Sequence, residues 1–325
     1  MKSGGARMLR NILAKETRTL VIALGLLLLA LLVPNLKIPR STYTYIVFID
    51  ITQSMNVEDY ALNGTPVSRL DYARHSIREA LRELPCGSRI GLGAFAEYRT
   101  LLLLAPIEVC ENYNDLLASL DHIDGRMRWL NSSEIAKGVF WSVRAAKEIG
   151  EGANVMFLTD GQEAPPPRSS ALPNFEDVKS GQVHGWLIGV GGYVPQPIPK
   201  TDREGNRIGY WRAEDVIQRQ SVSEGGTVGE TREHLSGLRE PHLQRIAQRV
   251  GFEYAHLVTA STISEALRDP RFAQVRPVPT DLYWLPAAAA LLVLAFRFRP
   301  DLRDGRSWPR SFRRDPQRLK SRLIS

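Results

Sequence analysis

Several signatures of common enzyme classes are missing from this chain of 325 residues. It contains no G-x-S-x-G and no H-E-x-x-H motif, which mark α/β-hydrolases and zinc metalloproteases. Its six histidines are scattered along the sequence. A glycine cluster at 189–192 lacks the G-x-G-x-x-G spacing of a dinucleotide-binding loop. These absences argue against hydrolases and dinucleotide-dependent enzymes, and we expect the protein not to be an enzyme.

Net positive charge is missing from the middle of the chain, although the formal net charge of the whole chain is +7. Residues 1–18 hold five basic residues and one acidic residue, a charge of +4, and residues 297–325 hold ten basic and three acidic residues, a charge of +7. The middle therefore carries −4. A nucleic-acid-binding protein is expected to place its basic residues on the folded domain, so we expect no nucleic-acid partner.

No uncharged apolar run reaches the roughly 20 residues that comfortably cross a bilayer. The two longest runs nevertheless lie beside the basic ends. We expect an N-terminal transmembrane anchor over 19–36 and a C-terminal transmembrane helix over 282–297, because aromatic residues open the second run and arginines follow it. A cleaved signal peptide is the alternative for the first run, and a buried core helix is the alternative for the second.

The basic ends also predict the topology. The positive-inside rule places residues 1–18 and the basic tail 298–325 in the cytoplasm, an N-in/C-in arrangement. The acidic middle then lies on the other side. Because the sequence shows no eukaryotic sign, we expect a bacterial inner-membrane protein whose folded part is periplasmic. The basic tail over 297–325 would contact a cytoplasmic partner or bind only anionic membrane lipid.

Cysteine is scarce, and the two cysteines suit an oxidising compartment. Cys86 precedes and Cys110 follows a predicted hairpin whose turn centres near Tyr98. Facing positions of an antiparallel hairpin have numbers with a constant sum, and 86 and 110 add up to twice 98. We therefore predict a disulfide between them. The alternative is two unrelated small core residues.

Strand and helix patterns alternate over residues 43–268. A helix is predicted over 68–84, where apolar residues recur every three or four positions, and apolar runs on either side predict buried strands. The pattern indicates an α/β fold with a doubly wound, mostly parallel sheet and one antiparallel edge strand. Residues 193–235 form an irregular insertion with a hairpin turn at 202–206.

One buried strand ends in a distinctive polar segment. An apolar run over 45–49 is followed by Asp50, Thr52 and Ser54, three oxygen-bearing side chains at every second position. In a continuing strand they would lie about 6.6 Å apart. If the chain turns after Asp50, the three oxygens converge and suit a hard cation such as Mg2+.

This segment, Asp50-x-Thr52-x-Ser54-Met55, resembles the metal-ion-dependent adhesion site of von Willebrand factor A (vWA) domains. Two further segments in the family's order strengthen the resemblance, which covers 43–268. Ser133 stands where the family usually has threonine, and Asp160 follows another apolar strand. The resemblance implies a metal site formed by five side chains, Asp160 acting through water: Asp50, Thr52, Ser54, Ser133 and Asp160.

Other interpretations of these residues remain open. The order Asn131-Ser132-Ser133-Glu134 resembles a helix-capping arrangement, which would occupy a hydroxyl with backbone N–H groups. A vestigial site would leave Asp50 and Asp160 as caps of helix N-termini. A Mg2+-dependent phosphotransferase with an aspartyl nucleophile would need an acid at position 52, where this chain has threonine.

The expected ligand set leaves few negative charges on the ion. The ion would stay electrophilic and keep an open position, which a carboxylate of a protein partner completes. We expect Mg2+, with Ca2+ or Mn2+ as alternative divalent cations. The predicted chemistry is binding of an acidic partner.

A narrower resemblance suggests the client. Residues 50–56, 84–88 and 97–99 resemble the vWA accessory proteins of bacterial methanol oxidation, which are usually encoded with a MoxR-type AAA+ ATPase. The resemblance implies maturation of a periplasmic methanol (quinoprotein) dehydrogenase, with that ATPase and other vWA accessory proteins as partners. An aerotolerance-type vWA protein with another client and a metal-free membrane scaffold are the alternatives.

Overall fold

The computed structural model describes residues 4–33, 36–167, 172–173, 177–217, 221–222, 228–229 and 232–299. The chain divides into two compact units: one comprises Lys37–Val278, and the other joins residues 1–36 to 279–325. The predicted basic tail over 298–325 lies outside the described residues from position 300 onward, and parts of the predicted insertion also lie outside them.

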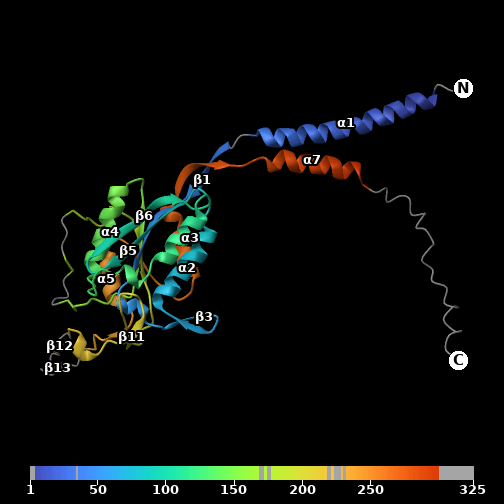
Figure 1. Ribbon diagram of the computed structural model, residues 1–325. Helices are drawn as coiled ribbons and strands as arrows, with labels where there is room; N and C mark the ends of the chain where they lie inside the picture. Colours follow the sequence, from blue (N-terminus) through green and yellow to red (C-terminus); the bar gives the residue numbers. More distant parts are fainter. Residues whose placement is uncertain are drawn as a thin grey trace, which may run out of the picture. The chain divides into compact units, whose positions relative to one another are not determined.

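The larger unit is built around a six-stranded sheet (Figure 1). Neighbouring strands are parallel except at one edge, where β6 runs antiparallel to β5. This confirms the predicted mostly parallel sheet with one antiparallel edge strand. In order across the sheet, the strands are β15 (Glu253–His256), β8 (Gly185–Gly189), β7 (Asn154–Thr159), β2 (Thr44–Asp50), β5 (Arg89–Ala96) and β6 (Arg99–Glu108).

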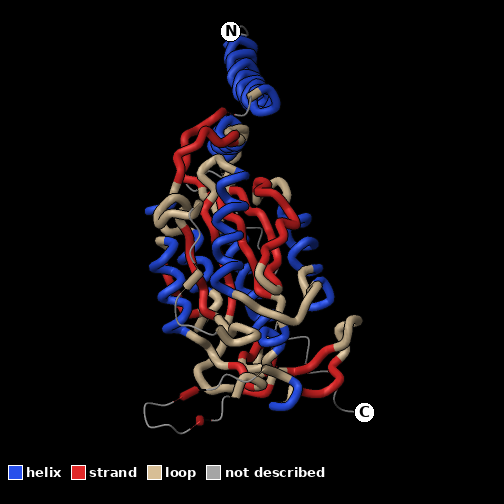
Figure 2. The backbone as a smooth tube through the Cα atoms, turned by 90° about the vertical axis from the view of Figure 1, so that its left-hand side faces the viewer, coloured by secondary structure: helices blue, strands red, loops and turns tan. Residues whose placement is uncertain are grey.

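Helices cover both faces of the sheet (Figure 2). Side chains of α2 (Arg69–Glu83), α3 (Tyr113–His122) and α6 (Ser261–Leu267) form one buried cluster with the sheet. Those of α4 (Ile135–Ile149) and α5 (Glu240–Val250) form a second cluster. The fold is therefore doubly wound, as the alternation of strands and helices predicts.

The central strand β2 explains the solid apolar run before Asp50. Its side chains alternate between the two clusters: Tyr45, Val47 and Ile49 belong to one, and Ile46 and Phe48 to the other. All five are completely buried, because helices cover both faces. This burial fixes β2 and brings its carboxyl end to the edge where ligands bind in such sheets.

Short elements complete the described chain. The hairpin of β10 and β11 encloses the turn expected at 202–206. The remaining strands are β1 (Leu36–Thr42), β3 (Tyr60–Leu62), β4 (Thr65–Val67), β9 (Gln196–Pro197), β10 (Pro199–Thr201), β11 (Arg207–Tyr210), β12 (Ser221–Val222), β13 (Val228–Gly229), β14 (Leu235–Ser236) and β16 (Gln274–Thr280). The 3-10 helices are η1 (Gln53–Asn56), η2 (Gly125–Met127), η3 (Ala213–Asp215) and η4 (Pro270–Phe272).

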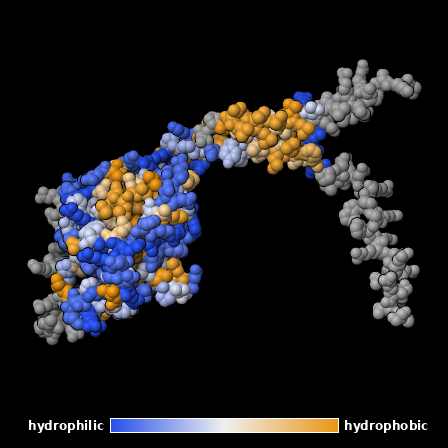
Figure 3. Space-filling view, viewed as in Figure 1, coloured by the Kyte–Doolittle hydropathy of each residue, from blue (hydrophilic) through white to orange (hydrophobic). Residues whose placement is uncertain are grey.

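The smaller unit contains two apolar helices, α1 (Gly4–Leu32) and α7 (Trp284–Arg297). They lie side by side, and Figure 3 shows that α7 and the C-terminal half of α1 are predominantly hydrophobic. Among the described residues, no helix combines the length and the hydropathy needed to cross a membrane. The transmembrane helices predicted over 19–36 and 282–297 are therefore not found: α7, for example, has 14 residues, whereas a span takes about 20.

The predicted disulfide between Cys86 and Cys110 is present. It closes the hairpin of β5 and β6, whose turn lies at Glu97 and Tyr98. Two register shifts between Ile90 and Gly93 move the pairing sum from 195 near the turn to 197 at Arg89 and Glu108. The bond thus joins the open end of the hairpin that carries the antiparallel edge strand.

Replacing both cysteines by serine should lower the free energy of unfolding by about 3 kcal/mol, because the bond closes a loop of 24 residues in the unfolded chain. Urea unfolding of the oxidised protein, the reduced protein and the double variant measures this effect. Reduced wild type should unfold like the variant. Equal unfolding midpoints for all three samples would contradict the predicted role.

Candidate metal centre

The first segment turns as metal binding requires. After Asp50, the backbone leaves the sheet and enters η1. The Thr52 amide donates a hydrogen bond to Asp50 Oδ1 at 2.9 Å, which holds this turn. The hydroxyl oxygens of Thr52 and Ser54 come within 3.2 Å of each other. The side chains that would diverge in a strand therefore converge at its carboxyl end.

The second segment presents a hydroxyl without a partner. Ser133 is held through its backbone, since its amide donates to the Ala164 carbonyl at 2.7 Å and its carbonyl accepts from the Ala164 amide at 2.8 Å. The side chain is buried, and Ser133 Oγ has no hydrogen-bond partner among the described residues. Buried hydroxyls normally have one, so the lone pairs of this oxygen are available to a ligand.

The capping arrangement expected at 131–134 is not formed. Helix α4 begins at Ile135, and no side chain of its N-cap residue, Glu134, bonds to its first turn. Glu163 accepts a hydrogen bond from the Ala136 amide at 3.3 Å instead. The Asn131 side chain accepts from Gln53. The Ser133 hydroxyl is thus left available for another role.

The third segment forms a hydrogen bond to the first. Thr159, the last residue of β7, donates its hydroxyl hydrogen to Asp50 Oδ2 at 2.6 Å. Asp160 follows, and its Oδ1 accepts from the Gln162 amide at 3.0 Å. Neighbouring parallel strands place Asp50 and Asp160 at the same edge of the sheet, as predicted.

A buried arginine that the sequence analysis did not single out forms an ion pair with Asp160. Arg69 opens α2 and is fully buried. Its Nη1 lies 2.8 Å from Asp160 Oδ2 and 2.7 Å from Ser236 Oγ, and its Nη2 lies 2.6 Å from Asp59 Oδ2. Burial opposes the charged form, but the hydrogen bonds and charges of Asp59 and Asp160 raise the pKa of Arg69 overall. One guanidinium therefore serves two carboxylates.

Asp50 forms no ion pair among the described residues, and Arg128 acts on it through charge alone. It is completely buried. Burial and, next, the charge of Asp160 raise the pKa of Asp50 to about 7, although hydrogen bonds from Thr159 and Thr52 oppose this rise. A buried carboxylate in this position needs either a proton or a cation.

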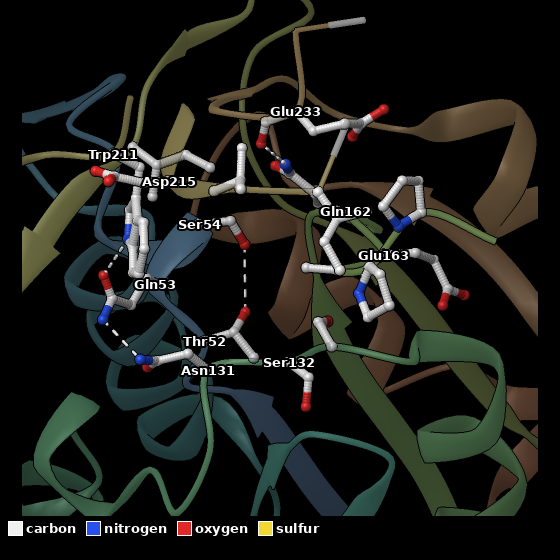
Figure 4. A pocket seen from close by; sticks show the side chains of 17 residues that line it. Thr52, Gln53, Ser54, Asn131, Ser132, Gln162, Glu163, Trp211, Asp215 and Glu233 are labelled. Atoms are coloured by element: carbon white, nitrogen blue, oxygen red, sulfur yellow. Dashed lines mark hydrogen bonds between the residues drawn. The ribbon is translucent and has the colours of Figure 1, made fainter. Parts of the chain in front are cut away.

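The available oxygens fit a hard divalent cation. Thr52, Ser54 and Ser133 line one pocket, with Thr52 and Ser54 facing it in Figure 4. Asp50 does not line the pocket itself but accepts a hydrogen bond from the amide of Thr52, which does. A carboxylate with neutral hydroxyls is an oxygen donor set of the kind that Mg2+ prefers. Because Arg69 already binds Asp160 Oδ2, Asp160 suits only an indirect contact with the ion.

The helix pattern contained a signal for Arg69. Arg69 shares the stripe of α2 that carries Ala73, Ser76 and Ala80, all of which are buried. A charged residue on a buried helix stripe requires a partner of opposite charge. No comparable pattern indicated which carboxylates it would bind, because Asp59 and Asp160 lie in loops.

Comparisons with known proteins reveal distant likenesses only. No family model matches the chain, and no curated protein sequence matches it. Among solved structures, an aerotolerance-related membrane protein from Bacteroides fragilis has 19% identity and a TM-score of 0.48, covering 69% of this chain and 96% of its own. A membrane-spanning protein from Vibrio fischeri has 19% identity and a TM-score of 0.28, and the match covers 68% of this chain and 94% of that protein. A von Willebrand factor type A structure from Catenulispora acidiphila has 12% identity and a TM-score of 0.36, covering 77% and 43%. Such distant likenesses establish no shared function.

Substituting Arg69→Met should cost about 3–5 kcal/mol of unfolding free energy, because it leaves two carboxylates without their cation. The double variant Arg69→Met/Asp160→Asn should lose less unfolding free energy than Arg69→Met, since one of the two unpaired buried carboxylates is removed. Chemical unfolding of both variants measures the difference. Arg78→Met, at a partly exposed ion pair of the same helix, is the control and should change stability by at most about 1 kcal/mol. Equal losses at Arg69 and Arg78 would refute the network.

The raised pKa of Asp50 predicts a pH dependence in protein treated with a chelator. Between pH 3.8 and about 7 the folded state holds more protons at Asp50 than the unfolded state. This contribution to stability is therefore fully present below that window and is lost as the pH rises through about 7. The unfolding free energy of wild type minus that of Asp50→Asn should fall by up to about 4 kcal/mol as the pH rises across this window. A constant difference would contradict the assignment.

Proposed function

We propose that this chain is a vWA-type binding protein that holds an acidic protein partner through a divalent cation, with Mg2+ the best match and Ca2+ or Mn2+ as alternatives. The observation that carries the proposal is the buried, unpartnered Ser133 hydroxyl in the same pocket as Thr52 and Ser54. Asp50, which is buried and forms no ion pair among the described residues, would supply the negative charge.

The charge arrangement favours binding of a carboxylate. Arg69 neutralises part of the charge of Asp160, so Asp50 would be the main anion close to the metal. An ion with so few anionic ligands retains its attraction for a further carboxylate. That carboxylate would come from the partner and complete the coordination shell. The role is adhesion, with no chemical turnover.

A phosphotransferase is less well supported. Such an enzyme would use Asp50 as nucleophile and an acid at position 52 to protonate the leaving group. Position 52 is threonine, whose hydroxyl contacts Ser54. Both Asp50 oxygens also accept hydrogen bonds, from the Thr52 amide and the Thr159 hydroxyl. These contacts suit a fixed metal ligand.

The proposed setting is the bacterial inner membrane, with the larger unit in the periplasm and both ends of the chain in the cytoplasm. This topology needs the apolar segments near both ends to cross the bilayer, although no described helix has the length and hydropathy of a span. The basic ends and the disulfide support this placement. The proposed client is a periplasmic methanol dehydrogenase of the quinoprotein class, matured with a MoxR-type AAA+ ATPase. Its support is the resemblance of segments 50–56, 84–88 and 97–99. An aerotolerance-type role with another client is the second candidate.

Mg2+ should stabilise the wild-type protein, because a ligand that binds only the folded state raises the unfolding free energy. At one hundred times the dissociation constant the gain is about 2.7 kcal/mol. Thermal melting with Mg2+ and with EDTA measures the effect. Asp50→Ala should abolish it, and Glu204→Ala, at an exposed position of the insertion, should preserve it. Identical wild-type melting in Mg2+ and EDTA would remove the metal claim.

A further inference from the structure

The candidate metal centre opens into a cavity of about 260 Å3 whose opposite wall belongs to the insertion (residues 193–235). Figure 4 shows Trp211 and Asp215 of the insertion across the pocket from Gln162 and Glu163. Thr52 lies between them. The insertion contributes these residues to the lining: Ile198, Trp211, Asp215, Val216, Ile217 and Glu233. A ligand on the metal would therefore touch the insertion as well.

Hydrogen bonds fix the key aromatic residue of this wall. The Trp211 indole N–H donates to Gln53 Oε1, and the Trp211 amide donates to the Ile198 carbonyl at 3.0 Å. Lys200 places its ammonium 4.5 Å from the centre of the indole ring. Gln53 belongs to the first metal-site segment, so the wall and the candidate ligands form one preorganised unit.

A second set of hydrogen bonds connects the insertion to the metal-site segments. Arg128 donates to the Asn131 side chain at 2.8 Å, to the Ile51 carbonyl at 3.3 Å and to the Thr201 hydroxyl at 3.4 Å. These acceptors come from the second segment, the first segment and the insertion, respectively. The wall is thus joined to two of the three segments by a single side chain.

Four of the six insertion residues in the lining are apolar, and each acidic side chain of the lining lies near a basic or imidazole side chain. Glu163 lies 2.9 Å from His242, Asp215 lies 3.5 Å from Lys200, and Glu233 lies 3.4 Å from Arg239. Lys200 and Arg239 offset the charges of Asp215 and Glu233, which lowers the repulsion that an incoming carboxylate meets. Beside it, Ile198, Trp211 and Ile217 offer an apolar surface.

The insertion also exposes apolar side chains beyond the cavity. Ile217 is 68% exposed at the rim. Four further large residues of the insertion are at least 49% exposed: Tyr193, Val194, Ile208 and Tyr210. Figure 3 shows hydrophobic residues among the polar surface of this unit. Exposed apolar groups next to a pocket indicate a protein partner. The cavity is smaller than the roughly 300–1,000 Å3 of most small-molecule sites, so it suits one or two side chains.

We propose that this pocket selects a peptide segment in which the metal-binding acidic side chain adjoins a large apolar side chain, and that the apolar side chain packs against Trp211, Ile198 and Ile217. The selection rests on the proposed function, since the ion must bind the acid. Beyond the proposed function, the inference is that the insertion determines which acidic segment binds.

The test uses three fluorescent heptapeptides with the full-length protein and fluorescence anisotropy in Mg2+ or EDTA. Their central residues are Leu-Glu-Leu, Ser-Glu-Ser and Leu-Gln-Leu. The first should bind in Mg2+ at least about fivefold more tightly than the second, because the apolar contact is lost there. The third should not show Mg2+-dependent binding.

Ile217→Ser and Trp211→Ala should each reduce the preference for the leucine peptide, measured as the ratio of the dissociation constants of the serine and leucine peptides. Ile217 is exposed, so its substitution leaves the core intact even if Trp211→Ala unfolds. Ile208→Ala, at an exposed position outside the cavity lining, is the matched control and should retain the preference.

Equal Mg2+-dependent binding of the leucine and serine peptides would overturn the inference and leave the proposed function standing. Absence of peptide binding by a protein that Mg2+ stabilises would also overturn it. Absence of both effects would remove the proposed function and, with it, the inference. Binding of acetylated glutamate as tightly as the leucine peptide would show that the apolar wall selects nothing, which again contradicts the proposal.

Discussion

One buried guanidinium holds together four parts of the chain, two of which lie 91 and 167 residues away from it in sequence. Arg69 connects the start of α2 to Asp59, to Asp160 after β7 and to Ser236 in β14. A guanidinium removed from water is costly unless its hydrogen bonds and charges are matched. Because every partner comes from a different loop or strand, the matched state fixes the carboxyl edge of the sheet and the end of the insertion together.

This network also decides what the edge can bind. By occupying Asp160, Arg69 leaves Asp50 as the buried carboxylate that forms no ion pair among the described residues. The neighbouring hydroxyls of Thr52, Ser54 and Ser133 are neutral donors around it. A divalent ion held there would keep much of its attraction for an outside carboxylate. The ion pair inside the protein and the proposed adhesion outside it are therefore parts of one electrostatic arrangement.

Much of the frame could be predicted from local patterns. Apolar runs and periodicity indicated the sheet and α2, whereas the turn after Asp50 entered only as the condition under which the three oxygens converge. The pairing sum placed Cys86 opposite Cys110 because the register shifts of the hairpin change it by only one or two residues. The start of α4 was not predictable, since Glu163, distant in sequence, replaces the local cap.

Local sequence patterns also could not predict the partners of Arg69 or the apolar wall of the insertion. Asp59 and Trp211 lie in irregular segments, and only the folded chain brings them to their partners. The apolar runs near the two ends were correctly expected to be helical, but the spans expected of them are not found among the described residues. Long-range contacts and exact helix length depend on the whole fold, which periodicity does not encode.

The most direct measurement of the central claim is an anomalous difference map from crystals of this protein soaked in Mn2+, a close substitute for Mg2+ at oxygen sites. The account predicts one strong peak about 2.1–2.3 Å from an Asp50 oxygen and from Ser133 Oγ, with Asp160 still bound to Arg69. A map without a peak there, or with the ion bound directly by Asp160 after Arg69 has moved away, would contradict the account.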